Sequence, residues 1–198
     1  MNQFEHSILS QLEDEAIANK IPIMKPDGIA FLRQIILMGK VKTVLEIGTA
    51  IGYSAIAMAM TTDVTVVSIE RNLTMFEKAR NNVDSAHLAD KIKLILADAL
   101  SIDISDLGTF DLLFIDAAKG QNLSLFQKFA SLVPKGGIII IDNLLFHGFV
   151  ENPETIISRD RRQMIHKIQQ FNEWILNNDH YDSYIYNLGD GIGVCYKK

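Results

Sequence analysis

Residues 43–54 have the sequence Thr-Val-Leu-Glu-Ile-Gly-Thr-Ala-Ile-Gly-Tyr-Ser, in which a short apolar run leads directly into a glycine-rich turn. This arrangement is typical of doubly wound α/β proteins, which bind ligands outside the carboxyl ends of their strands. Gly48 and Gly52 let the backbone approach a ligand closely, but the G-x-G-x-x-G spacing of dinucleotide sites is absent. The turn therefore favours a nucleoside without a pyrophosphate.

Further apolar runs follow this one, separated by turns and helical patterns, as in a mostly parallel α/β sheet. The predicted parallel strands are Thr43–Ile47, Val64–Ile69, Ile92–Leu96, Asp111–Ile115 and Ile138–Ile141. Tyr184–Leu188 and Ile192–Tyr196 flank Gly189-Asp190-Gly191 and predict a closing antiparallel hairpin. The expected fold class is α/β: a single-domain, doubly wound, Rossmann-like sheet of five parallel strands plus this C-terminal hairpin.

Two helices are predicted before the first strand. Residues 3–19 place apolar side chains four positions apart with acidic residues between them, which is an amphipathic helical pattern. A second helix is expected to begin after Pro26 and to end at Gly39. We therefore expect N-terminal helices over residues 1–40 and a Rossmann-like core over residues 43–198, within one domain spanning residues 1–198.

Composition limits the possible partners and location. The formal net charge of −5 gives no general attraction to nucleic acid, so a polyanion would need a local basic patch. One such cluster, which could also be the solvated face of a helix, consists of Arg159, Arg161, Arg162, His166 and Lys167. The single cysteine, Cys195, excludes an internal disulfide, and no apolar run approaches the length of a membrane span. We expect a cytoplasmic protein.

Acidic residues at the strand ends indicate a nucleoside site. Glu46 lies in an apolar strand, where a carboxylate needs a partner such as a ligand's amino group. Glu70 closes the second strand, where it can accept hydrogen bonds from both ribose hydroxyls. This arrangement resembles the class I methyltransferases. The resemblance implies S-adenosylmethionine as cofactor, with its methionine part in the glycine-rich loop, its ribose on Glu70 and its adenine beside Asp98 and Ala99.

Two more acids follow the fourth and fifth predicted strands. Asp116 ends one, and Asp142 with Asn143 ends the other. If these strands are neighbours, their ends lie about 4.8 Å apart and the side chains converge. Two carboxylates and an amide oxygen form a hard ligand set that suits Mg²⁺, although each acid alone could instead cap a helix.

The chain from Ile23 onward is more specifically similar to metal-dependent O-methyltransferases of the catechol and caffeoyl-coenzyme A type. The matching motifs are Glu-Ile-Gly-Thr, Ile-Asp-Ala-Ala-Lys, Ile-Asp-Asn and Leu-Gly-Asp-Gly-Ile. The resemblance implies that Asp116, Asp142 and Asn143 bind the metal ion and that Lys119 is the general base. The cofactor-binding residues it implies are Met24, Glu46, Gly48, Thr49, Ser54, Glu70, Asp98, Ala99 and Asp116.

Among bacterial families, the chain resembles the tRNA 5-hydroxyuridine methyltransferases, which implies methylation of O5 to give 5-methoxyuridine. A small catechol or phenol is the alternative substrate, because it also offers a hydroxyl beside a second oxygen. A non-catalytic nucleoside-binding protein and an NAD-dependent dehydrogenase are further alternatives, the latter weakened by the missing dinucleotide spacing. Family resemblance and the amphipathic N-terminal helix also favour a homodimer.

Overall fold

The structure is a computed structural model that describes residues 3–61, 63–150 and 158–198. The chain forms two compact units, Met1–Asp103 and Ile104–Lys198, which are described separately below. Within the described residues, no helix combines the length and the apolar character needed to cross a membrane.

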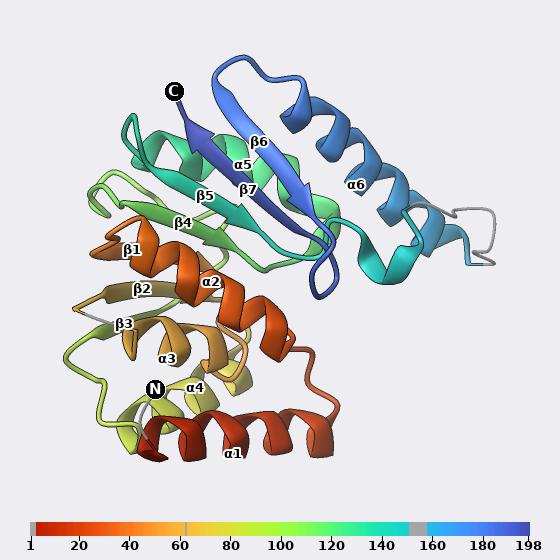
Figure 1. Cartoon of the computed structure of the whole chain (residues 1–198). Coiled ribbons are helices and arrows are strands. Elements are labelled where there is room, and N and C mark those ends of the chain that lie inside the picture. The colour runs from red at the N-terminus through yellow and green to blue at the C-terminus, as the bar shows by residue number, and fades with distance from the viewer. Residues whose placement is uncertain (1–2, 62, 151–157) are drawn as a thin grey trace. The chain divides into compact units, whose positions relative to one another are not determined.

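The first unit begins with the two predicted helices, α1 (Gln3–Asn19) and α2 (Pro26–Met38). Helix α1 buries Leu9, Leu12 and Ala16, and it packs beside α3 (Tyr53–Ala59), as Figure 1 shows. Pro26 suits the first turn of α2 because an N–H group there has no partner within the helix. Both helices are therefore confirmed.

Three parallel strands form the sheet of the first unit in the order β3-β2-β1 (Figure 1). They are β1 (Thr43–Ile47), β2 (Thr65–Glu70) and β3 (Ile92–Leu96), with α4 (Leu73–Ser85) between β2 and β3. The register pairs Glu46 of β1 with Ser68 of β2. Residues paired in this way lie side by side across the two strands, so a carboxyl and a hydroxyl group are brought together inside the sheet.

The second unit contains a four-stranded sheet in the order β4-β5-β7-β6. Its strands are β4 (Leu112–Ile115), β5 (Ile138–Ile141), β6 (Tyr181–Tyr186) and β7 (Ile192–Lys197). Its helical elements are η1 (Lys119–Gln121), α5 (Asn122–Phe129), η2 (Ala130–Leu132), η3 (Phe146–Gly148) and α6 (Arg159–Leu176). Strands β4 and β5 are parallel, whereas β7 is antiparallel to both β5 and β6.

The predicted strands are confirmed with small shifts, except that β6 begins three residues before the predicted Tyr184. Its side chains alternate between half-buried and exposed, starting with half-buried Tyr181 and exposed Asp182. Aspartate is uncommon in strands, which is why the sequence pattern placed the start too late. The strand also ends at Tyr186, two residues before the predicted Leu188, which lengthens the hairpin loop without changing the predicted fold class.

Candidate functional site

The glycine-rich loop after β1 is a tight turn that requires glycine at two positions. Gly48 and Gly52 have φ angles of 100° and 86°, in the left-handed region that side chains disfavour. A Cβ atom on Gly52 would also lie 3.4 Å from the Cβ of Ala79 in α4. The Gly48 N–H donates to the carbonyl of Ile69 at 2.9 Å, so the loop is bound to the end of β2.

Glu70, the predicted ribose-binding acid, lies against this loop. One of its carboxylate oxygens accepts hydrogen bonds from the N–H groups of Thr49 and Ala50, at 3.2 and 2.9 Å. The other accepts from the N–H of Asn72 at 2.8 Å. These three hydrogen bonds hold the Glu70 side chain in place. Since each carboxylate oxygen can accept more than one hydrogen bond, the side chain retains the capacity to accept from ligand hydroxyls.

Glu46 is completely buried and has two hydroxyl donors inside the protein. Ser54 donates to one carboxylate oxygen and Ser68 to the other, both at 2.5 Å, and Ser68 also bonds to the Thr49 hydroxyl at 2.6 Å. Burial raises the pKa of Glu46 to about 7; the two serine hydrogen bonds oppose this effect, and the charge of Glu70 adds to it. The expected partners of Glu46 are thus serines, and direct contact with a ligand's amino group stays a prediction.

Ser68 was missed at the sequence level. The only signal was a small hydroxyl residue within the otherwise apolar strand Val66–Ile69. Its importance depends on the register between β1 and β2, which places it opposite Glu46.

The remaining predicted cofactor residues of the first unit differ in exposure. Met24 is buried just before α2, and Thr49 and Ser54 are buried in and after the glycine-rich loop. Asp98 is exposed after β3, where its carboxylate accepts a hydrogen bond from the N–H of Leu100 at 2.8 Å. Ala99 beside it is half-buried. Their contacts with the cofactor stay predictions.

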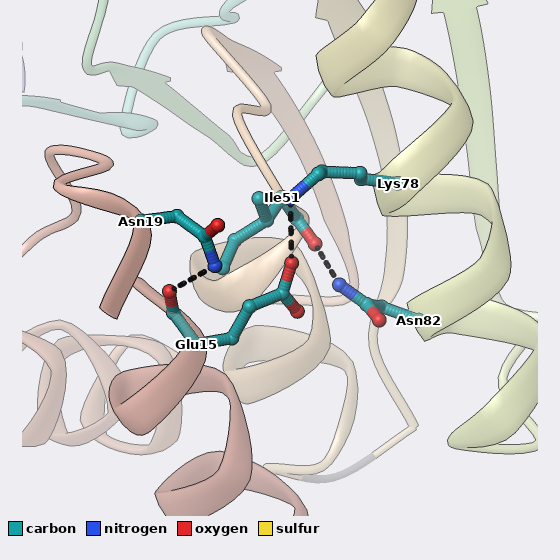
Figure 2. A network of polar contacts seen from close by, with 5 residues as sticks. All are labelled: Glu15, Asn19, Ile51, Lys78 and Asn82. Carbon is teal, nitrogen blue, oxygen red and sulfur yellow. Dashed lines mark hydrogen bonds and ion pairs between the residues drawn. The ribbon is translucent and has the colours of Figure 1, made fainter. Parts of the chain in front are cut away.

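Polar contacts connect helices α1 and α4 to each other and to the glycine-rich loop. Asn82 of α4 donates to the carbonyl of Ile51 at 2.9 Å, and Lys78 of α4 forms an ion pair of the same length with Glu15 of α1 (Figure 2). The hydroxyl of Tyr53, the first residue of α3, donates to Glu13 of α1 at 2.5 Å. The N-terminal helix is therefore connected to the C-terminal end of the glycine-rich turn, directly through Tyr53 and indirectly through Lys78 of α4.

In the second unit, acidic residues follow neighbouring strands, as predicted. The register pairs Ile115 with Ile141, so Asp116 and Asp142 come directly after paired positions. Asp142 is only 5% exposed, and its pKa is raised to about 7, first by burial and then by the charge of Asp116.

Asp190 in the hairpin loop also raises the pKa of Asp142, whereas the N–H of Asn143 and the charge of Lys119 lower it. The Asp190 carbonyl accepts hydrogen bonds from Leu145 and Phe146, which brings the loop beside the segment after β5. A Cβ atom on Gly191 would lie 2.4 Å from the Leu145 nitrogen, so this approach requires glycine. The Leu-Gly-Asp-Gly-Ile motif contained Asp190, but its proximity to Asp142 depends on the folded hairpin.

The predicted metal ligands follow β4 and β5 and are all oxygen donors. Within the described ranges, no cluster of three or more His, Cys, Asp or Glu residues is arranged to hold a metal. The predicted ligands are of a different composition, two carboxylates and the amide of buried Asn143, all of which offer the oxygen atoms that Mg²⁺ prefers. Like charges around a buried carboxylate favour either its protonation or a bound cation. Lys119 begins η1, with its Nζ 4.5 Å from the centre of the Phe146 ring.

Comparison with known proteins decides the family. The whole chain, residues 1–198, matches the family model described as O-methyltransferase. The chain belongs to the O-methyltransferase family. The predicted enzyme class is therefore confirmed: the protein is an S-adenosylmethionine-dependent O-methyltransferase.

Relatives of this O-methyltransferase include plant enzymes. Caffeoyl-CoA O-methyltransferase 2 from Eucalyptus globulus is 29% identical over 174 residues, covering 83% of this chain and 70% of that relative. The flavonoid 3',5'-methyltransferase from Vitis vinifera is 26% identical over 175 residues, covering 83% and 74%.

Solved structures confirm the Rossmann-like methyltransferase fold. A Staphylococcus aureus protein described as a candidate caffeoyl-CoA O-methyltransferase is 36% identical, with a TM-score of 0.92 and coverage of 96% of this chain and 92% of that one. A Bacillus cereus O-methyltransferase, solved in complex with SAH, is 27% identical, with a TM-score of 0.82 and coverage of 96% and 91%.

Proposed function

We propose that the protein transfers the methyl group of S-adenosylmethionine to a hydroxyl of a small catechol or phenol, with Mg²⁺ at the end of β5. The observation that carries this proposal is the environment of Asp142. This carboxyl is buried, and its pKa is raised by burial and by the charges of Asp116 and Asp190. Oxygen donors of this kind would hold a hard cation, which would make a substrate hydroxyl beside it more acidic. The names of the two plant relatives, which act on a caffeoyl ester and a flavonoid, support a phenolic acceptor.

The first unit supplies the residues for the cofactor. The loop at Gly48 and Thr49 surrounds its methionine part, and Glu70, held by two loop amides, accepts hydrogen bonds from the ribose hydroxyls. Met24, Ser54, Asp98 and Ala99 complete this set. Asp116 is the remaining residue of the predicted cofactor-binding set.

The second unit supplies the residues for the acceptor. Asp116, Asp142 and Asn143 would hold the ion, which, when bound, makes an adjacent hydroxyl more acidic. Lys119 accepts the hydroxyl proton at Nζ. The acceptor oxygen then forms its bond to the methyl carbon while the carbon–sulfur bond breaks, and S-adenosylhomocysteine leaves.

A second candidate substrate is 5-hydroxyuridine in tRNA. The observation that favours it is the basic cluster on α6, whose members are all exposed: Arg159, Arg161, Arg162, His166 and Lys167. Exposed arginines on one helix can contact a phosphate backbone without reading its sequence. An acceptor of this kind would give 5-methoxyuridine.

The deciding experiment compares both acceptors under one set of conditions. Purified protein, S-adenosylmethionine and Mg²⁺ are incubated with catechol-type phenols or with hydroxyuridine-containing tRNA, and products are identified by mass spectrometry with and without a chelator. We expect chelator-sensitive methylation of the phenol. Product from tRNA alone, lost in the double charge reversal of Arg161 and Arg162, would replace the phenolic proposal with the tRNA one.

A homodimer and a cytoplasmic location complete the proposal. Sedimentation of the purified protein measures the first, and cell fractionation the second.

A further inference from the structure

Ser68 lies at the centre of a chain of hydroxyl and carboxyl groups that leads into the glycine-rich loop. It is fully buried on β2, 2.5 Å from a carboxylate oxygen of Glu46 and 2.6 Å from the hydroxyl oxygen of Thr49. Thr49 follows Gly48 in the loop and is itself 2% exposed. The Ser68 side chain therefore connects β1, β2 and the loop.

The number of protons determines the direction of these hydrogen bonds. A serine hydroxyl has one proton to donate. When Glu46 is ionised, that proton goes to the carboxylate, and the Thr49 hydroxyl must donate to Ser68. The Thr49 oxygen then keeps a lone pair that can accept from a cationic donor, such as the ammonium group at the amino-acid end of the cofactor.

We propose that Ser68 is a positioning residue for the cofactor: by donating to the buried Glu46 carboxylate it orients the Thr49 hydroxyl so that its oxygen accepts from the cofactor's ammonium group, which the charge of Glu46 attracts. The proposal rests on the proposed cofactor role of the glycine-rich loop. Ser68 itself does not touch the ligand, because it is fully buried; it acts through its hydrogen bonds to Glu46 and Thr49.

Because the pKa of Glu46 lies near 7, the proposal can be tested by measuring cofactor affinity as a function of pH. The Ser54 and Ser68 hydroxyls lower the pKa of Glu46, and Glu70 is the charged group whose effect raises it. Ammonium binding favours ionised Glu46, so affinity should fall as the pH decreases through the pKa of Glu46, near 7. Removing the Ser68 donor should raise that pKa and move the fall in affinity to higher pH.

The experiment measures the affinity for S-adenosylhomocysteine by calorimetry from pH 6 to 9 for the wild type, Ser68→Ala, Ser68→Cys and Thr61→Ala. We expect Ser68→Ala to bind on the order of tenfold more weakly near pH 7, with its pH midpoint raised by about one unit. Ser68→Cys keeps a weaker donor and should fall between Ser68→Ala and the wild type. It also serves if Ser68→Ala fails to fold.

Thr61→Ala is the matched control, because the Thr61 hydroxyl bonds to the carbonyl of Ala57 and to Arg33 in the same unit, outside the glycine-rich loop. We expect it to bind like the wild type. An unchanged midpoint in the Ser68 variants, whether or not affinity falls, would overturn the positioning role. A wild type that fails to bind S-adenosylhomocysteine would instead contradict the proposed function.

Discussion

The two units place their acidic side chains in different surroundings. In the first, Glu46 accepts hydrogen bonds from two serines, and Glu70 accepts three from backbone N–H groups. In the second, Asp142 lies near Asp116 and Asp190, and their charges raise its pKa. Glu46 and Glu70 thus accept several hydrogen bonds from the protein, whereas Asp142 accepts one from the Asn143 N–H and lies near two other carboxylates.

This difference indicates what each region binds. Glu70, which is half-buried and held by three backbone N–H groups, is organised in advance and can receive a ligand's hydroxyl groups without rearranging. A buried acid beside like charges is costly when ionised, and a cation from outside relieves that cost. The first arrangement suits the cofactor, and the second suits a metal ion.

Replacing Asp142 with Asn should have the largest effect on function. The amide keeps an acceptor for the Asn143 N–H, which bonds to Asp142 at 2.7 Å, but removes the buried charge. We expect Mg²⁺-stimulated methyl transfer to fall on the order of 100-fold and the metal-free protein to melt about 5 °C higher at pH 8.

Methyl-transfer assays and thermal melts with a chelator measure these two changes. Asp182→Asn, at an exposed position on β6, is the control and should change neither quantity. Full metal-stimulated activity in Asp142→Asn would eliminate the proposed metal role of this acid.

Glu46→Gln tests the cofactor side of the comparison. The glutamine keeps the volume and an acceptor but loses the charge, so affinity for S-adenosylhomocysteine should fall on the order of tenfold at pH 8. Stability at the same pH should rise, because a fully buried ionised group has been removed. Calorimetry and thermal melting check both effects, with exposed Glu77→Gln as control. Tighter binding in Glu46→Gln would mean that the charge opposes the cofactor.

Both acids should make stability depend on pH in the same direction. Their folded pKa values of about 7 lie above ordinary carboxyl values, so the folded state binds more protons than the unfolded state between about pH 4 and pH 7. Their contribution to stability is therefore lost as the pH rises through 7. We expect the melting temperature of a Glu46→Gln, Asp142→Asn double variant to exceed that of the wild type increasingly from pH 5 to pH 8. A constant difference, measured with a chelator present, would argue against both shifts.

Sequence reasoning predicted those features that depend on local pattern. Apolar runs located every strand, and Pro26 and Gly39 marked the ends of α2. The acids at strand ends were found because parallel strands place their carboxyl ends along one edge. Family resemblance then supplied the cofactor and the chemistry.

Residues that depend on pairing between distant segments were missed. Ser68 becomes important only when the register sets it beside Glu46, and Asp190 only when the hairpin loop packs against Leu145. A change of one residue in register would reverse the face of each side chain, so periodicity alone could not select them. The predicted polar partner of Glu46 was accordingly sought in the ligand, although the protein provides two.

The smallest expected effect concerns the contacts of α1 with α3 and α4 inside the first unit. Lys78 and Glu15 are each about one third exposed, so their ion pair should contribute at most about 1 kcal/mol, and Lys78→Met should lower the melting temperature by less than about 4 °C.

Tyr53→Phe removes a part-buried donor to Glu13 and should lower the stability of the protein at least as much as Lys78→Met does. Because Tyr53 begins α3 directly after Gly52, hydrogen exchange should show faster opening of α1 in Tyr53→Phe, with partial recovery when S-adenosylhomocysteine binds. Equal exchange with and without the ligand would show that α1 is held independently of the cofactor loop.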